Sequence, residues 1–303
     1  MKEKMVGYVN VLLTMFVYAF SGVFIVGLAK YVGMYATIFW RGIFCLVISF
    51  GILWFFKAMG KPSFGYQGKF RAVDLLANYV IQPLLMVAWV LAVLLADANA
   101  ALFFVLVSQQ IVTFVINWWF KGRPDGLTIF ANLMMLGGVL IYSWPLESIF
   151  NWGVFFALLY GLISGVRMAM LHEMKVSKAS DRLFLLLMQS LVIVFVGWLM
   201  IKFGGAALVP TTGVPVEGWL VVLGASLVII VTQFMEMFSL SKIDANITTV
   251  IMSSELAVAG LLNGYIVGQM MNTNQWIGSA ILMLSMSIVP IVLYVRHKTQ
   301  LSL

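Results

Sequence analysis

Five ionisable side chains lie inside stretches that are otherwise apolar enough for a membrane interior: Arg41, Asp74, Arg167, Glu236 and Glu255. A charge at that depth is costly unless it is paired or faces water, so such residues mark candidate functional sites. Glu255 is the deepest acid. A carboxyl there can carry a proton, which makes Glu255 the candidate coupling group. Pairing with Arg167 or with Arg41, which we predict to be a structural charge, would instead keep Glu255 ionised in a structural ion pair.

Two stretches each present a polar face whose side chains are three or four residues apart: Asn10, Thr14, Tyr18 and Ser21 in one, and Tyr160, Ser164 and Arg167 in the other. Residues at this spacing share one side of a helix. Hydrogen bonding between helices explains Thr14 and Ser21. Arg167 instead indicates solute binding, because packing alone requires no guanidinium.

Further amide, acidic and aromatic side chains lie in four more stretches: Asn78, Gln82 and Trp89, then Gln109 and Gln110, then Gln233 and Glu236, and finally Ser254 beside Glu255. We predict that these residues bind substrate together with Tyr18, Tyr160, Ser164 and Arg167. For Glu236 a solvated role also stays open, because it lies near the end of its stretch. Aromatic rings beside an acid are typical of sites that hold an amine by charge and cation–π attraction.

The composition is that of an integral membrane protein. Of the 303 residues, 63% are hydrophobic and 10% are charged, whereas soluble domains carry about 25% charged residues. The net charge of +7 is explained by basic cytoplasmic loops and requires no nucleic acid partner. The single cysteine, Cys45, excludes a disulfide framework and a thiolate-rich metal site. We predict no metal and no cofactor.

Ten stretches are long and apolar enough to cross a bilayer, which takes about 20 residues: 6–29, 34–56, 70–95, 98–120, 127–144, 150–172, 182–203, 218–239, 245–268 and 275–295. The predicted fold is therefore an all-α integral membrane protein with ten transmembrane helices. Spans one, three, four, six, eight and nine carry the polar faces and are predicted to enclose a central cavity, with spans five, seven and ten at the periphery.

The basic residues predict the orientation. Of the 18 Lys and Arg residues, Arg41 and Arg167 lie within spans, Lys30 and Lys202 fall on one side, and the rest fall on the other. Basic loops stay in the cytoplasm. We therefore expect a multi-pass protein of the cytoplasmic (inner) membrane with both termini in the cytoplasm.

An internal repeat divides the chain. Asp97-Ala98-Asn99-Ala100 recurs as Asp244-Ala245-Asn246-Ile247 at an offset of 147, and each Asp is predicted to cap the helix that follows it. Five spans per repeat is an odd number, so the second repeat enters the membrane from the opposite side. The expected domains are a first five-helix repeat, 1–146, and a second, inverted repeat, 147–303, an arrangement that many secondary transporters share.

The end of the second repeat carries a family resemblance. Ser254-Glu255-Leu256-Ala257-Val258-Ala259-Gly260 leads to Gly268-Gln269 and then Gln275-Trp276-Ile277-Gly278. With the ten spans and the two halves, this pattern resembles the drug/metabolite transporter superfamily, EamA type, although Leu256 stands where a Pro is usual and Gln269 where a Glu is usual. The resemblance implies a transporter of amino acids, drugs or metabolites.

The sequence favours a secondary active transporter that moves a small polar organic metabolite by alternating access, coupled to protons or working by exchange. An amino acid or amine-type solute fits best, since Glu255 suits an amine and Arg167 a carboxylate. The alternatives are transport of drugs or toxic cations, or of nucleoside-type metabolites, and, from other classes, a non-transporting subunit or an intramembrane enzyme. No Walker-type loop or His-Glu-x-x-His motif occurs. Expected partners are the solute and the lipid bilayer, with the chain a monomer or homodimer.

Overall fold

The computed structural model describes residues 2–60, 72, 76–96, 98–144, 151–174, 178–205, 207–208, 213–267 and 271–301. Over these residues the regular structure is helical and contains no strand. The elements are α1 (Lys2–Tyr18), α2 (Ser21–Val32), α3 (Met34–Ala58), the π-helix η1 (Leu76–Ile81), α5 (Gln82–Leu95), α6 (Ala98–Lys121), α7 (Gly126–Tyr142), α8 (Trp152–Met174), α9 (Ala179–Gly204), α10 (Val216–Leu240), α11 (Ala245–Met252), α12 (Glu255–Val267) and α13 (Thr273–Leu301).

The described residues form eight helical segments that are long and apolar enough to cross a membrane. Each coincides with one of the predicted spans. The predicted spans 70–95 and 127–144 instead coincide with shorter apolar helices, Tyr79–Leu95 and Gly126–Tyr142. Helices are favoured here because hydrocarbon offers no partner to a free backbone amide or carbonyl. The prediction of an all-α membrane protein is thus confirmed.

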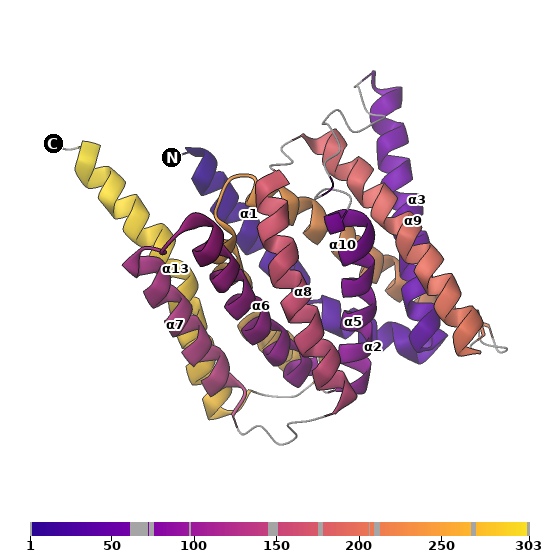
Figure 1. Ribbon diagram of the computed structural model, residues 1–303. Helices are drawn as coiled ribbons and strands as arrows, with labels where there is room; N and C mark the ends of the chain where they lie inside the picture. The colour runs from indigo at the N-terminus through magenta and orange to yellow at the C-terminus, as the bar shows by residue number, and fades with distance from the viewer. Residues whose placement is uncertain are drawn as a thin grey trace.

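The helices run side by side in a bundle, and the start of α1 lies at the same end as the end of α13 (Figure 1). Large apolar side chains cover the outer surface. Trp119, Phe203 and Tyr265, for example, are more than four-fifths exposed. Such a surface would drive a soluble protein to associate, but it is the surface expected of a bundle surrounded by lipid.

Two pairs of helices are joined by glycines on both partners. In the pair α3–α9, a Cβ on Gly42 would press on Val194, and a Cβ on Gly197 would press on Phe39. The pair α7–α13 is built in the same way, from Gly138 on one helix and Gly278 on the other. Small residues let membrane helices approach until their backbones touch.

Helix α8 carries a row of small residues, Gly153, Ala157, Gly161 and Gly165, each four positions from the next. A Cβ on Gly153 would collide with the backbone at Ala96, just after α5. Cβ atoms on Gly161 and Gly165 would collide with α6. This row brings α8 into direct backbone contact with its neighbours and fixes the position of the polar side chains that α8 carries.

Three of the spans are interrupted within the described part of the chain. The first is kinked between α1 and α2, the third begins with η1 before Pro83, and the ninth is kinked at Ser253–Ser254 between α11 and α12. Transport sites are commonly built at broken helices. Asp244 caps α11, with its carboxylate accepting from the Asn246 amide at 2.8 Å, as predicted. Its repeat mate Asp97 lies outside the described residues.

Candidate functional site

A polar cavity lies between the helices. Its polar and aromatic lining comes from α1, α5, α6, α8, α10 and α12: Tyr18, Gln82, Trp89, Gln109, Tyr160, Ser164, Arg167, Gln233, Glu236 and Glu255. The six spans predicted to wall a cavity are therefore the ones that line it, and ten of the predicted substrate-binding residues meet there.

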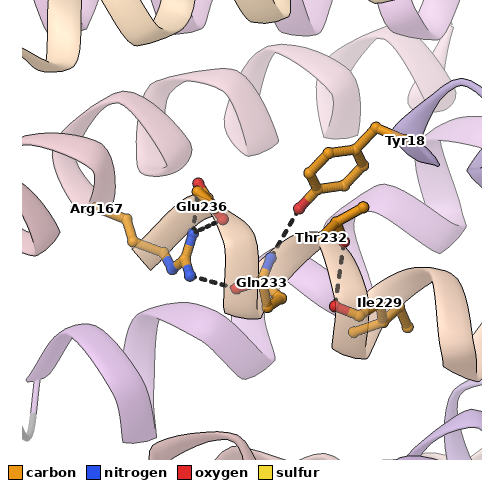
Figure 2. A network of polar contacts seen from close by, with 6 residues as sticks. All are labelled: Tyr18, Arg167, Ile229, Thr232, Gln233 and Glu236. Atoms are coloured by element: carbon orange, nitrogen blue, oxygen red, sulfur yellow. Dashed lines mark hydrogen bonds and ion pairs between the residues drawn. The ribbon is translucent and has the colours of Figure 1, made fainter. Parts of the chain in front are cut away.

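Arg167 of α8 is the centre of a hydrogen-bonded network (Figure 2). Its guanidinium Nη1 lies 3.1 and 3.2 Å from the two carboxylate oxygens of Glu236. Its Nη2 donates to the side-chain oxygen of Gln233, whose Nε2 donates in turn to the Tyr18 hydroxyl at 2.7 Å. The network ties α8 to α10 and α1.

The ion pair between Arg167 and Glu236 is buried. The side chains of Arg167 and Glu236 are only 2% and 3% exposed. Their charges cancel locally, so Arg167 presents little net positive charge to a ligand in the cavity. The sequence left open that Glu236 is solvated, but in the structure its side chain is buried and paired with Arg167.

Glu255 is placed differently from the other cavity acid. It begins α12 directly after the kink at Ser253–Ser254, and its side chain is 8% exposed. No described residue forms an ion pair or hydrogen bond with its carboxylate. The pairing with Arg167 or Arg41 that the sequence left open is therefore not formed here, because Glu236 occupies Arg167.

Aromatic rings form one wall of the cavity. The rings of Trp89 and Tyr160 lie 5.4 Å apart, tilted by 43°. The Trp89 indole donates to the Ser21 hydroxyl at 3.3 Å, which fixes its orientation. The interhelical role predicted for Ser21 is observed, whereas Thr14 bonds to the Asn10 carbonyl of its own helix.

Gln82 adds a second unused acceptor to the cavity. It is 3% exposed, and its amide oxygen has no hydrogen-bond partner within the described part of the chain. A buried acceptor without a donor is unfavourable. Gln82 and Glu255 together leave the cavity with acceptors that a ligand's N–H groups can satisfy.

Of the three remaining predicted substrate-binding residues, two do not join this group. Gln110 donates to Asn132 and so connects α6 to α7. Ser254 donates to the Leu282 carbonyl of α13 at 3.2 Å. The side chain of Asn78 lies outside the described residues. Arg41, on α3, also lies off the cavity lining.

No family model matches the chain, and no curated protein matches it. Several solved structures share its fold. One crystal structure of a protein superposes with a TM-score of 0.74 over 96% of this chain and 99% of that chain, at 11% sequence identity. At that identity the likeness shows a common fold and carries no statement about activity.

The apolar part of the lining was not predicted from the sequence. Leu102, Val105 and Leu106 lie on the same face of α6 as Gln109, and Met168 and Met252 complete the set. The α6 residues precede Gln109 at helical spacings of three and four positions, and this pattern could have predicted that they share its face. These side chains make part of the cavity lining apolar.

The chain offers little metal or nucleophilic chemistry around the cavity. Within the described ranges, no three His, Cys, Asp or Glu residues cluster in a way that could hold a metal ion. His172 has a structural role at the end of α8, where its Nδ1 donates to the carbonyls of Leu240 and Ile243 at 2.8 and 3.1 Å. Cys45 is buried and points to the Ser226 carbonyl.

Proposed function

We propose that this protein is a secondary active transporter that moves a small polar organic solute, an amino acid or an amine, across the cytoplasmic membrane by alternating access. The proposal is carried by the Glu255 carboxylate, which has no partner among the described residues and lies in a cavity whose other acid is already neutralised by Arg167. A buried carboxylate without a partner is expected to take up a cation.

The chemistry of the cavity favours an ammonium group as that cation. Glu255 supplies a charge, the Gln82 oxygen supplies an acceptor, and Tyr160 and Trp89 supply π-faces. The apolar face of α6 suits the carbon portion of the solute. Midplane sites of this kind are typical of transporters built from broken helices.

The packing of the helices supports a repeat of two halves, which is the arrangement that the sequence resemblance to the drug/metabolite transporter superfamily implies. Suppose that the repeat matches α1–α2 with α8, α3 with α9, η1–α5 with α10, α6 with α11–α12, and α7 with α13. Each main contact between two helices is then repeated between their mates. The contacts of α8 with α5 and α6 correspond to those of α1 with α10 and α11. The pairs α3–α9 and α7–α13 are each formed by two mates, as helices beside a twofold axis would be.

Glu255 also provides a simple basis for coupling. A single carboxylate can bind a proton or the solute's ammonium group, but not both at full strength. Competition between the two makes the protein exchange one for the other as the site faces each side of the membrane. This mechanism needs no nucleotide and uses only a residue that lines the cavity.

Purified protein in liposomes tests the proposal. An imposed proton gradient should drive labelled amino acids or amines across the membrane, and Glu255→Gln should abolish the gradient-driven component. Glu217→Gln is the matched control, because Glu217 is an exposed acid at the start of α10. If no amino acid or amine crosses, or if Glu255→Gln transports like the parent protein, the assignment fails.

A second candidate, export of drugs or toxic organic cations, is favoured by the same aromatic wall and unpaired acid. Such cations lack a carboxylate and require only Glu255 and the rings. Liposomes with a range of aromatic quaternary amines separate the two candidates. Transport of those amines without transport of amino acids would select the second candidate.

A further inference from the structure

A second polar pocket, the cytoplasmic pocket, lies at an end of the bundle that the basic residues predict to face the cytoplasm. Its lining includes Asn117, Arg123 and Thr128 around the turn between α6 and α7, and Asp244 and Asn246 at the start of α11. None of these five residues lines the central cavity. The two polar spaces are therefore separate in the structure.

The cytoplasmic pocket presents one donor and one acceptor that are not satisfied. Asn117 and Asn246 are each only 4% exposed. The Asn117 Nδ2 and the Asn246 Oδ1 have no hydrogen-bond partner in the described part of the chain, although the two side chains line the same pocket. A buried polar atom without a partner is unfavourable. A molecule that both accepts and donates hydrogen bonds would satisfy both amides.

One face of α6 leads from this pocket to the central cavity. Gln109 lines the cavity, Asn117 lines the pocket, and Thr113 lies four positions from each of them. Residues four apart share a face of a helix, and eight residues advance by about 12 Å. Thr113 is therefore the midpoint between the two polar spaces.

The hydroxyl of Thr113 differs from other buried hydroxyls of the bundle. Those of Ser108 and Thr232 donate to the carbonyl four residues earlier in their own helices, at 2.6 and 2.7 Å. Thr113 is 0% exposed, yet its Oγ1 has no partner among the described residues. The packing at Thr113 closes the passage at the cost of an unsatisfied hydroxyl, which water or a solute would satisfy if the helices separated.

Helix α11 packs against α6 and also reaches both spaces, with Asn246 in the pocket and Met252 in the cavity. It ends at the kink at Ser253–Ser254, where the Ser254 amide bonds to the Ile251 carbonyl, three residues back, at 3.1 Å. Such a break at the end of an element can act as a hinge. Because Glu255 follows the kink directly, movement of α11 is linked to the acid of the cavity.

We propose that the cytoplasmic pocket is a second solute-binding site, and that the solute passes from it to Glu255 between α6 and α11 when these helices separate. Asn117 donates to an acceptor of the solute, and Asn246 accepts from its N–H group. An amino acid carries both kinds of group, whereas a simple amine carries no acceptor. This inference rests on the proposed function and favours amino acids within its substrate class.

Access to Thr113 tests the route. In a Cys45→Ala background, Thr113→Cys should react with a small membrane-impermeant thiol reagent in inside-out vesicles, because separation of α6 from α11 exposes it. Ser285→Cys on α13 is the matched control, since Ser285 is equally buried and lines neither space. It should stay unreactive. Thr113→Cys that reacts no faster than Ser285→Cys, or reacts only from the outer side, would overturn the route.

Protection from labelling tests the pocket as a binding site. Thr128→Cys places a thiol in the pocket and leaves Asn117 and Asn246 unchanged. A mixture of neutral amino acids should slow its labelling more than a mixture of the corresponding decarboxylated amines does. Asn246→Leu should raise the half-protecting concentration about fivefold, the effect of losing one neutral hydrogen bond. Met59→Cys, at an exposed position after α3, should be labelled equally with and without amino acids.

The pocket is not a solute site if amino acids fail to slow the labelling of Thr128→Cys, or if Asn246→Leu leaves the protection unchanged. Equal protection by the amines would contradict the preference for amino acids.

Thr113→Val separates a role in the route from a role in folding. The variant keeps the shape of the side chain and removes the unsatisfied hydroxyl, so it should melt no lower than the parent protein. Uptake into liposomes should slow, because the closed interface becomes more stable, and Thr113→Ser should transport at a rate closer to that of the parent. A clearly lower melting temperature of Thr113→Val would show that the hydroxyl is bonded in the closed interface, and the inference would be wrong.

Failure of the inference is distinct from failure of the transporter assignment. Uptake that depends on Glu255, together with an unreactive Thr113→Cys and an unprotected Thr128→Cys, would leave the transporter standing and overturn this route. Absence of any uptake would overturn both.

Discussion

The contact between Arg167 and Glu236 changes the role assigned to Arg167. From the sequence, Arg167 was the natural group for a solute carboxylate. With Glu236 at 3.1 Å and both side chains buried, it becomes part of the frame that holds α8 to α10. Glu255, which lines the cavity and has no such partner among the described residues, becomes the residue available to bind a cation.

The ion pair leads to a prediction on stability. Glu236→Gln leaves the Arg167 charge buried and unpaired, and should lower the free energy of unfolding by about 3 kcal/mol or more. Denaturant unfolding in detergent micelles measures this change. The double variant Arg167→Gln/Glu236→Gln is the matched control and should lose less than Glu236→Gln alone. Equal stability of Glu236→Gln and the parent protein would contradict the role given to the pair.

At the residue scale, the depth of a residue in the membrane and the side of the helix on which it lies are separate properties. Gln109 and Gln110 lie at nearly the same depth, yet Gln109 lines the cavity and Gln110 bonds to Asn132. Glu255 and Ser254 divide in the same way. Adjacent residues on a helix point about 100° apart, so the two members of a pair can face different neighbours, as they do here. Sequence spacing indicated the pairs but not the choice between their members.

At the scale of elements, α8 organises the bundle through its row of small residues. Gly161 and Gly165 touch the α6 backbone between Val105 and Val112. That contact sets how far Tyr160, Ser164 and Arg167 reach into the cavity. The row at every fourth position was present in the sequence, but it gives no indication of which neighbour it meets.

The contact gives a prediction for α8. Gly161→Ala would place a Cβ against the Ser108 hydroxyl and the Val105 carbonyl, and should cost about 2 kcal/mol of stability through overpacking. Gly137→Ala in α7 is the control, since nothing lies within 4 Å of the position that the new methyl group would take. The control should be neutral or slightly stabilising, by about 0.5 kcal/mol. Melting temperatures in detergent check both, and an unaffected Gly161→Ala would contradict the close packing.

At the scale of the whole molecule, the two ends of the chain agree with the charge pattern. The start of α1 and the end of α13 lie at one end of the bundle (Figure 1), as an even number of crossings requires. The excess of Lys and Arg predicts that this end faces the cytoplasm.

Cysteine labelling of intact cells measures the orientation. In a Cys45→Ala background, Lys202→Cys at the end of α9 should react with a membrane-impermeant maleimide. Arg123→Cys, in the turn between α6 and α7, should react only after the cells are permeabilised. Both parent residues are exposed, so access to the reagent depends on the side of the membrane. The reverse pattern of labelling would invert the topology.

The sequence by itself determined the helical membrane class and the positions of the helices. Apolar length decides both, because a backbone in hydrocarbon must bond within its own segment. It also determined which helices carry polar faces, since a face follows from local spacing alone. The wall of the cavity was predictable for this reason.

Only the tertiary structure decided which charges meet. Arg167 lies opposite Glu236 rather than Glu255, and Arg41 does not line the cavity. These choices depend on the rotation of each helix about its axis and on the distance between helices. Both are set by close packing of side chains far apart in the chain, such as Gly161 against Ser108, and no local pattern encodes them.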